Sequence, residues 1–374
     1  MYSRRTGIII GMLALLFLQS GSLWPAKAQD AATQQPPRET GYALKKPVFG
    51  GACKICPWGA IADIVKEALK PYGWDVQVCY NCAGSAQEAR IVAGALMPPP
   101  MSAVNSERLR AFGIGPHQIP PPPNGPVDFG VTTTNFLWWA YQGIHDFSKD
   151  PEGPRKHLRL LALIQSPLYL IVAAKTELGI TDLSQIKQKR WPVRLLWDKG
   201  LVGEATVDIL AYYGLSQKDI EDAGGHVASG LMRDERKNFD VIIYMGSPSN
   251  APEFNVWSEV SQKYDLTYLQ LPEDLLNKLA KDWDMERKAI PNGLLRGIER
   301  PIPTVVYTGN AIYGRTDMPD EFAYTVAQAM DEQQDLLPWS YENYSWNPHT
   351  VWKTYGVPLH PGAERYYREK GYMK

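Results

Sequence analysis

Four cysteines in two Cys-x-x-Cys pairs are the residues whose types and spacing most clearly permit chemistry. The pairs are Cys53 with Cys56 and Cys79 with Cys82, and the chain has no other cysteine. An even cysteine count in an exported protein favours disulfides, with three possible connectivities. The pairs are separated by 22 residues, which is close to a zinc-type spacing, and a Cys-x-x-Cys-Pro run that opens a helix could also be a redox-active dithiol. We rank disulfides first, a metal site second and the dithiol third.

Polar residues at predicted strand ends form a second candidate set, because ligands of open α/β sheets bind beyond the carboxyl ends of the strands. Thr132, Thr133 and Asn135 follow an apolar run and offer two hydroxyls and an amide to a polar ligand. Each could instead belong to a turn or a helix cap. Gly84 and Ser85 open a predicted helix, where free amide groups could bind an anion or Ser85 could act as an ordinary N-cap.

Aromatic and acidic residues near other strand ends complete the residues predicted from chemistry. Trp58 and Trp197 follow predicted strands and are expected to form walls of a ligand site. Asp198 and Glu204 lie near the start of the next helix, where carboxylates suit the helix dipole. If they face the ligand, they disfavour an anionic group and suit a hydroxyl, an ammonium or a metal-bound ligand. Tyr307 could contact the ligand or pack at a hinge.

Sequence signatures of catalysis are missing from the chain. It has no Gly-x-Ser-x-Gly elbow, no phosphate-binding loop and no His-Glu-x-x-His motif, and its six histidines are scattered. We therefore expect a binding protein that is not an enzyme and that carries no cofactor.

The N-terminus resembles an export signal. Arg4 and Arg5 precede an apolar run at 7–18, and a small-x-small cleavage site ends at Ala28. The apolar run is shorter than the roughly 20 residues needed to span a membrane, so we predict that residues 1–28 are a cleaved signal peptide. This places the mature protein in the periplasm. Residues 29–42 are polar and proline-containing, as expected for a flexible tether.

Charge and length narrow the class of protein. The predicted signal holds three basic and no acidic residues, so the mature 346 residues carry 36 basic and 40 acidic side chains, a net charge of −4. This balance argues against nucleic-acid binding, which requires a basic surface. A chain of this length predicts two domains, each with its own core.

Short β-type runs alternate with helical patterns, which predicts α/β units with largely parallel sheets. Two apolar strands at 158–165 and 168–175 follow one another closely, and the chain is expected to cross between domains there and to return at 302–314. The predicted architecture is a two-lobed α/β binding protein with a hinge and a ligand cleft between the lobes. The expected boundaries are 43–166 plus 303–374 for lobe 1, with a proline-rich insertion at 97–126, and 167–302 for lobe 2.

Several sequence blocks occur in the order found in one family of binding proteins. The blocks are Gly50 to Gly59, Gly84-Ser85, Asp128 to Asn135, Ile180 through Leu215, the predicted buried strand Asp240 to Met245 with Gly246 and Pro248 after it, Ile290 to Tyr307 and the closing run Leu359 to Gly371. Together they resemble the TAXI family, the extracytoplasmic solute-binding proteins of TRAP-type transporters. Gly51 and Gly246 lie within these blocks and join the candidate ligand-binding set. The acidic loop at Asp198 and the four cysteines depart from the family pattern.

The resemblance implies a monomeric receptor whose two lobes close on a small polar organic solute, an organic acid or an amino-acid-like compound. Closure would be a hinge motion stabilised by ligand, and the closed form would deliver the solute to TRAP-type membrane subunits. The alternative is a periplasmic metal-binding or accessory protein on the same scaffold, with the four cysteines as its working residues.

Overall fold

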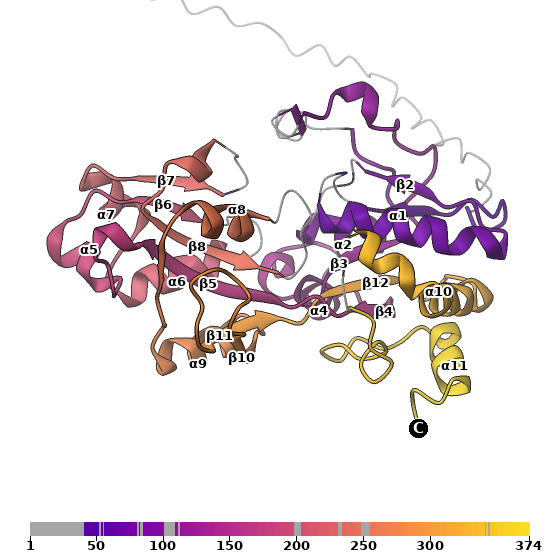
Figure 1. Ribbon diagram of the computed structural model, residues 1–374. Helices are drawn as coiled ribbons and strands as arrows, with labels where there is room; N and C mark the ends of the chain where they lie inside the picture. The colour runs from indigo at the N-terminus through magenta and orange to yellow at the C-terminus, as the bar shows by residue number, and fades with distance from the viewer. Residues whose placement is uncertain are drawn as a thin grey trace, which may run out of the picture. The chain divides into compact units, whose positions relative to one another are not determined.

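The computed structural model describes residues 41–51, 54, 56–80, 82, 85–100, 109–110, 113–197, 203–230, 234–247, 255–340, 342 and 345–374. Residues 39–374 form one compact unit that contains two β-sheets (Figure 1). The predicted signal peptide and the predicted tether before Gly41 lie outside the described residues. No helix in the described part of the chain is long and apolar enough to cross a membrane.

The first sheet has five strands, drawn from the beginning, the middle and the later part of the chain. In spatial order they are β2 (Gln77–Cys79), β1 (Val48–Gly50), β3 (Phe129–Thr133), β12 (Asn310–Arg315) and β4 (Leu158–Ile164). β1 pairs in parallel with both β2 and β3, whereas β12 runs antiparallel to both β3 and β4. The sheet therefore has a parallel half and an antiparallel half.

The second sheet has seven strands. Six of them follow the order β10 (Glu286–Ile290), β11 (Ile302–Tyr307), β5 (Leu168–Lys175), β8 (Val241–Gly246), β6 (Arg194–Trp197) and β7 (His226–Ser229), and β9 (Leu266–Tyr268) also pairs with β5. β5 is antiparallel to β11, β8 and β9, and the parallel pairs of this sheet are β6 with β7 and β6 with β8. The expectation of largely parallel sheets is thus wrong. Each strand that enters or leaves a sheet at a crossing runs against its neighbours, because it continues from the other sheet.

Ten helices and six short 3-10 turns are described around the sheets. The helices are α1 (Pro57–Leu69), α2 (Ser85–Ala93), α4 (Thr134–Gln142), α5 (Ser184–Lys189), α6 (Gly203–Tyr212), α7 (Gln217–Asp222), α8 (Val256–Lys263), α9 (Glu273–Asp282), α10 (Asp320–Glu332) and α11 (Pro361–Glu369). The 3-10 turns are η1 (Lys70–Tyr72), η2 (Pro116–Gln118), η3 (His145–Phe147), η4 (Thr176–Leu178), η5 (Glu235–Lys237) and η6 (Gln334–Ser340).

Side-chain alternation explains how β5 and β8 bury both of their faces. Leu170 and Val172 of β5 belong to one apolar cluster, whereas Tyr169 and Ile171 belong to another. Successive side chains of a strand point to opposite faces, so both clusters are built by the same two strands. The continuous apolar run of β8 is buried at every position, as the sequence predicted. The prediction of a mixed α/β chain with two sheets is confirmed.

The closing run of the sequence forms α11, which packs against α10 and β4. His360 is completely buried at the N-cap of this helix, where its Nδ1 accepts a hydrogen bond from the Gly362 N–H at 3.3 Å. A Cβ at Gly362 would lie 2.0 Å from the Asp320 carbonyl oxygen, so only glycine permits this approach of α11 to α10. Burial lowers the pKa of His360, which keeps the imidazole neutral in this structural role.

Candidate functional site

A small hollow lies where the chain crosses between the two sheets. Its volume is about 10 Å³, room for roughly one water molecule. The lining combines aromatic, hydroxyl, amide and carboxylate side chains from distant parts of the chain: Pro57, Trp58, Thr133, Ser166, Leu168, Ser247, Asn310 and Glu342. Two of these residues, Trp58 and Thr133, belong to the set predicted from the sequence.

Two crossing segments bring the strands of both sheets to this hollow. The first, at 165–167, joins β4 to β5, and the second, at 308–309, joins β11 to β12. A Cβ at Gly309 would lie 2.2 Å from the Ile164 carbonyl oxygen, so glycine is required where the segments pass one another. The Ser166 and Ser247 hydroxyl oxygens are 3.0 Å apart, which links the first crossing to the end of β8.

The Trp58 indole is held in place by the strand that returns to the first sheet. α1 begins at Pro57, a position that tolerates proline because the first helical N–H has no intrahelical partner. This start places Trp58 one residue into the helix, and its Nε1 donates to Asn310 Oδ1 at 2.7 Å. Trp58 is 8% exposed and Asn310 is 3% exposed. The hydrogen bond fixes an aromatic wall and aligns the Asn310 amide beside it.

The N-terminus of α4 carries hydrogen-bonding capacity that no described residue satisfies. Thr133 is its N-cap, but the hydroxyl makes no capping bond and Oγ1 has no partner within the described residues. The side-chain nitrogen and oxygen of Asn135, the second residue of α4, are likewise buried and have no partner among the described residues. Thr133 is 1% exposed and Asn135 is fully buried. Unpaired buried polar groups cost about 1–3 kcal/mol each, so such a cluster is expected where a ligand binds.

Thr134, which lies between these two residues, has partners for its hydrogen-bonding groups. The Thr134 and Thr308 hydroxyl oxygens are 3.0 Å apart, and the Thr134 N–H donates to the Gly309 carbonyl oxygen at 3.0 Å. These bonds attach α4 to the second crossing segment. Tyr355 interacts with the same pair of threonines, and burial raises the pKa of its phenol to about 12, so it stays neutral. The helix N-terminus supplies the positive end of the α4 dipole, which favours a polar or anionic group.

The other predicted site residues lie outside the lining of this hollow. Thr132 and Tyr307 are buried strand residues, and Tyr307 packs edge-on to Trp139 with ring centroids 6.3 Å apart. Trp197 ends β6 and lies in the large apolar core, so it is core packing at least in part. Glu204 is exposed in the first turn of α6, as expected for a residue that complements the dipole.

Two glycines of the predicted site, Gly246 and Gly51, have close neighbours that leave no space for a side chain. Gly246 is the last residue of β8 and directly precedes Ser247. A Cβ at Gly246 would meet Ile171 Cδ1 at 2.5 Å, so the position is constrained by packing. Gly51 follows β1, and a Cβ there would meet the Ala62 methyl at 2.7 Å. Gly84, Asp198 and the side chain of Ser85 lie outside the described residues.

The cysteines in the described part of the chain form disulfides. Cys79 and Cys82 are bonded to each other across a Cα–Cα distance of 5.5 Å. Cys56 is also disulfide-bonded, and Cys53 lies outside the described residues. The first-ranked interpretation is therefore confirmed for Cys79 and Cys82, which rules out a zinc thiolate at those two positions in this state. Within the described ranges, no group of three or more histidine, cysteine or acidic side chains could hold a metal ion.

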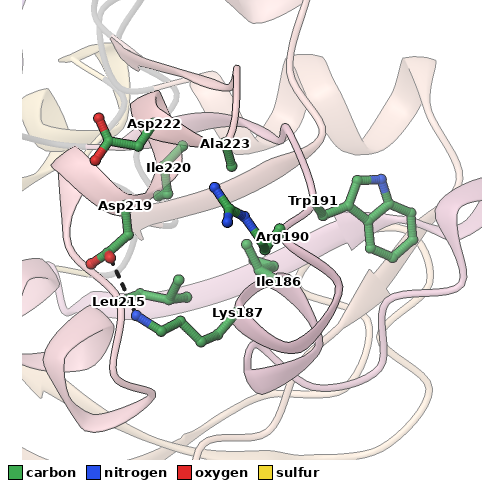
Figure 2. Close-up of a pocket in the computed structure, with 9 residues that line it drawn as sticks. All are labelled: Ile186, Lys187, Arg190, Trp191, Leu215, Asp219, Ile220, Asp222 and Ala223. Carbon is green, nitrogen blue, oxygen red and sulfur yellow. Dashed lines mark hydrogen bonds and ion pairs between the residues drawn. The ribbon is translucent and has the colours of Figure 1, made fainter.

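A larger hollow, of about 260 Å³, lies on the second-sheet side between α5 and α7 (Figure 2). Ile186, Leu215 and Ile220 contribute its apolar lining. Lys187 and Asp219 form an ion pair of 3.2 Å on its rim, with side chains about half exposed. This hollow is larger, but its lining residues directly precede β6 and β7, so it lies on the side of their amino ends and away from the carboxyl ends where ligands of α/β sheets bind. We therefore assign the site to the small hollow and not to this one.

Sequence reasoning missed most of the polar lining. Ser247 stands between two residues of a motif that the sequence had singled out, and Ser166 lies at the expected crossing, so both were within reach. Asn310 lies in the segment 302–314, where the chain was expected to return to the first domain, but only Tyr307 of that segment was singled out as a site residue. Glu342 is 1% exposed and comes from the C-terminal segment, where no local pattern distinguishes it from a surface carboxylate. Its position depends on long-range packing alone.

Comparison with known proteins gives the family of this chain. The model of the NMT1-like family matches residues 123–371, which is well over half of the sequence. The chain belongs to the NMT1-like family. The match includes β3, α4, both crossing segments and the closing helix, and so covers most residues that line the small hollow.

Several solved structures are similar to this chain at low sequence identity. One, described as a periplasmic transporter, has 11% identity and a TM-score of 0.41, covering 87% of this chain and 93% of that one. Malate-bound MatC from Rhodopseudomonas palustris has 8% identity and a TM-score of 0.40, covering 78% and 86%. Lactococcal OpuAC complexed with glycine betaine has 12% identity and a TM-score of 0.37, covering 79% and 99%.

Proposed function

We propose that this protein is an extracytoplasmic solute-binding receptor, not an enzyme, that captures a small polar organic solute. The observation that carries the proposal is the unmet hydrogen-bonding capacity of Thr133 and Asn135 at the N-terminus of α4. A hydroxyl, an amide and a helix N-terminus together suit a carboxylate or another polar group of an organic acid or amino-acid-like compound. No covalent chemistry is needed for these groups to act.

The position of the site supports a receptor in which binding and hinge motion are linked. The hollow is lined from both sheets. Its lining includes Ser166 of the first crossing segment and Asn310, which directly follows the second, and these segments are the connections that a hinge would use. A solute that binds residues of both sheets gains affinity only in the orientation that brings them together. It therefore shifts the population toward that orientation. The sequence resemblance to the TAXI family supports a TRAP-type transporter as the membrane partner and the periplasm as the location.

The alternative, a metal-binding accessory protein, loses its main support. Its working residues would be four thiolates, and the Cys79–Cys82 disulfide takes two of them. A disulfide beside the end of β2 instead helps to fix the first sheet next to the hollow. The receptor interpretation uses the residues that the structure brings together, so it is the one we adopt.

Native mass spectrometry of protein purified from the periplasm tests the proposal. The wild type is expected to retain an organic mass that disappears on denaturation, because unfolding destroys the site that holds the solute. Asn135→Leu should lose that mass while remaining folded, since leucine cannot hydrogen-bond to a polar ligand. Lys187→Ala, in the larger hollow, is the matched control and should retain it. Equal retention by wild type and Asn135→Leu would contradict the site.

A further inference from the structure

A cluster of aromatic rings and one carboxylate joins α4 to the second sheet's helices. The Trp139 Nε1 donates to Asp284 Oδ2 at 2.8 Å, a hydrogen bond to a charged acceptor. His145 lies between two indoles, with ring centroids 4.4 Å from Trp139 and 5.0 Å from Trp283. Its Nε2 is 3.5 Å from the same Asp284 oxygen. Trp139 and His145 come from the part of the chain between two strands of the first sheet, whereas Trp283 and Asp284 lie between α9 and β10 of the second.

Both polar members of the cluster have an unusual backbone. His145 has a φ of +50° and Asp284 a φ of +51°, in the left-handed region that non-glycine residues seldom occupy. Such conformations persist only where surrounding contacts hold them, and they concentrate at binding and switch regions. Here the two residues lie next to one another, with His145 Nε2 3.5 Å from Asp284 Oδ2. The local strain on each side is maintained by the contacts of the cluster.

The second-sheet half of the cluster is anchored firmly. Trp283 Nε1 donates to Asp208 Oδ2 at 2.9 Å, and Lys278 Nζ lies 2.9 Å from the same oxygen. Asp208 belongs to α6 and Lys278 to α9, so Trp283 is tied to two helices. Through Asp284, Trp139 is thus hydrogen-bonded to a segment that is fixed to two helices of the second lobe, and not to a loose turn.

The first-sheet half of the cluster leads directly to the candidate site. Trp139 lies on α4, the helix whose N-terminus presents Thr133 and Asn135. Trp139 lies five positions after Thr134, a distance of about 7.5 Å along a rigid helix at 1.5 Å per residue. The Trp139 ring also packs edge-on to Tyr307, which ends β11 just before the second crossing. One short helix therefore links the site to a contact between the lobes.

We propose that the cluster of Trp139, His145, Trp283 and Asp284 is a latch that holds the two lobes in one relative orientation, with α4 coupling the latch to the solute site. The latch itself is defined without any solute, and only its effect on affinity rests on the proposed function. The hollow has room for about one water molecule in the latched orientation, so an organic solute requires another orientation in order to enter. Loss of the Trp139–Asp284 bond is expected to populate such orientations, and apparent affinity then rises with the fraction of protein that is competent to bind.

Spin-label distance measurements on solute-free protein test the latch directly. Labels at Lys70→Cys in the first lobe and Lys218→Cys in the second, with the native disulfides intact, report the separation of the lobes. The latched protein should give one dominant distance. Asp284→Gly removes the carboxylate while glycine accepts the left-handed backbone, so folding should be preserved. It should raise the population at other distances about tenfold, the shift that one charged hydrogen bond supports.

Two further variants make the test specific. Asp284→Asn keeps an acceptor for the indole N–H and tolerates positive φ, so it should stay close to the latched protein. Trp139→Phe keeps an aromatic ring but loses the donor, so it should resemble Asp284→Gly. Distance distributions that are the same in all four proteins would overturn the latch. Changed distributions with an unchanged solute dissociation constant would overturn the coupling through α4 but would leave the solute site standing.

Discussion

Two buried polar clusters on the side of the first sheet differ in whether their hydrogen bonds are made. Asp331 of α10 accepts from Trp346 Nε1 at 2.8 Å, from the Tyr366 hydroxyl at 2.6 Å and from the Tyr372 hydroxyl at 3.0 Å. At the start of α4, the Thr133 hydroxyl and the Asn135 amide are equally buried and have no partner among the described residues. A satisfied cluster stabilises the fold, whereas an unsatisfied one lowers stability and retains capacity for a ligand.

The largest effect on stability is expected at the satisfied cluster. Asp331→Ala would leave one buried donor and two partly buried donors without this acceptor and release the closing segment from α10. Breaking a buried charged network of this kind costs about 3–5 kcal/mol of unfolding free energy. Urea unfolding monitored by circular dichroism measures the loss. A loss below about 1 kcal/mol would show that the three donors find water easily and that the network is not what holds the tail.

The unsatisfied cluster should respond in the opposite direction. Thr133→Val keeps the shape of the side chain and removes a hydroxyl that has no partner, so the free energy of unfolding should stay equal or rise by about 1 kcal/mol. Differential scanning calorimetry of solute-free protein measures the change. A clear decrease in the unfolding temperature would mean that the hydroxyl is already satisfied and would remove the contrast between the clusters.

Glu88 is a third buried polar group, and its unmet capacity has a different consequence. Its carboxyl packs against Gly50 and Gly130 of neighbouring strands, is completely buried and has no partner among the described residues. Burial raises the pKa of Glu88 well above its ordinary value. In the unfolded chain this carboxyl ionises near pH 4.5. The proton is therefore held more tightly in the folded state.

The pH dependence of stability follows from that difference. Below the unfolded-state pKa both states are protonated, and the stability due to Glu88 is fully present. As the pH rises, only the unfolded state loses the proton, so this stability declines until the folded-state pKa is passed. Glu88→Gln removes the effect, and its stability relative to wild type should increase between pH 5 and pH 8. Parallel urea titrations at both pH values check this, and a constant difference would show that Glu88 is paired when ionised.

The smallest effect is expected at the hollow between α5 and α7. Lys187 and Asp219 are about half exposed, and exposed ion pairs contribute little to stability because water and salt screen them. Lys187→Ala should leave both the unfolding temperature and the retained solute unchanged. The same calorimetry and native mass spectrometry serve as the assay. Loss of solute in this variant would move the binding site to the larger hollow.

Local patterns predicted the elements of the fold but not how the strands pair. The apolar runs that became β4, β5 and β8 were recognisable from composition and length. Their antiparallel pairing depends on where the chain crosses between sheets, and strand direction leaves no mark on a short apolar run. β10 was missed because four of its five residues are exposed and three of those, such as Glu286 and Lys288, are charged.

The candidate site was predicted in part for a similar reason. Thr133 and Trp58 were found because hydroxyls and aromatic residues at strand ends carry a local signal. Asn310 and Glu342 line the same hollow but lie more than 150 positions after Thr133 in the sequence, and only the assembled fold brings them there. Trp197 has the same local signal as Trp58, and both belong to the large apolar core, but only Trp58 lines the hollow. Sequence alone cannot separate the two, because their difference is set by what packs against them.

The central claim is that the start of α4 gives up stability in order to bind solute. The most direct measurement is the dissociation constant of the solute identified by native mass spectrometry, determined by calorimetric titration for wild type and Thr133→Val, beside their unfolding temperatures without solute. The account predicts at least tenfold weaker binding, the value of one good hydrogen bond, with an unfolding temperature that is equal or higher. Unchanged affinity, or weaker binding that merely follows a loss of stability, would contradict it.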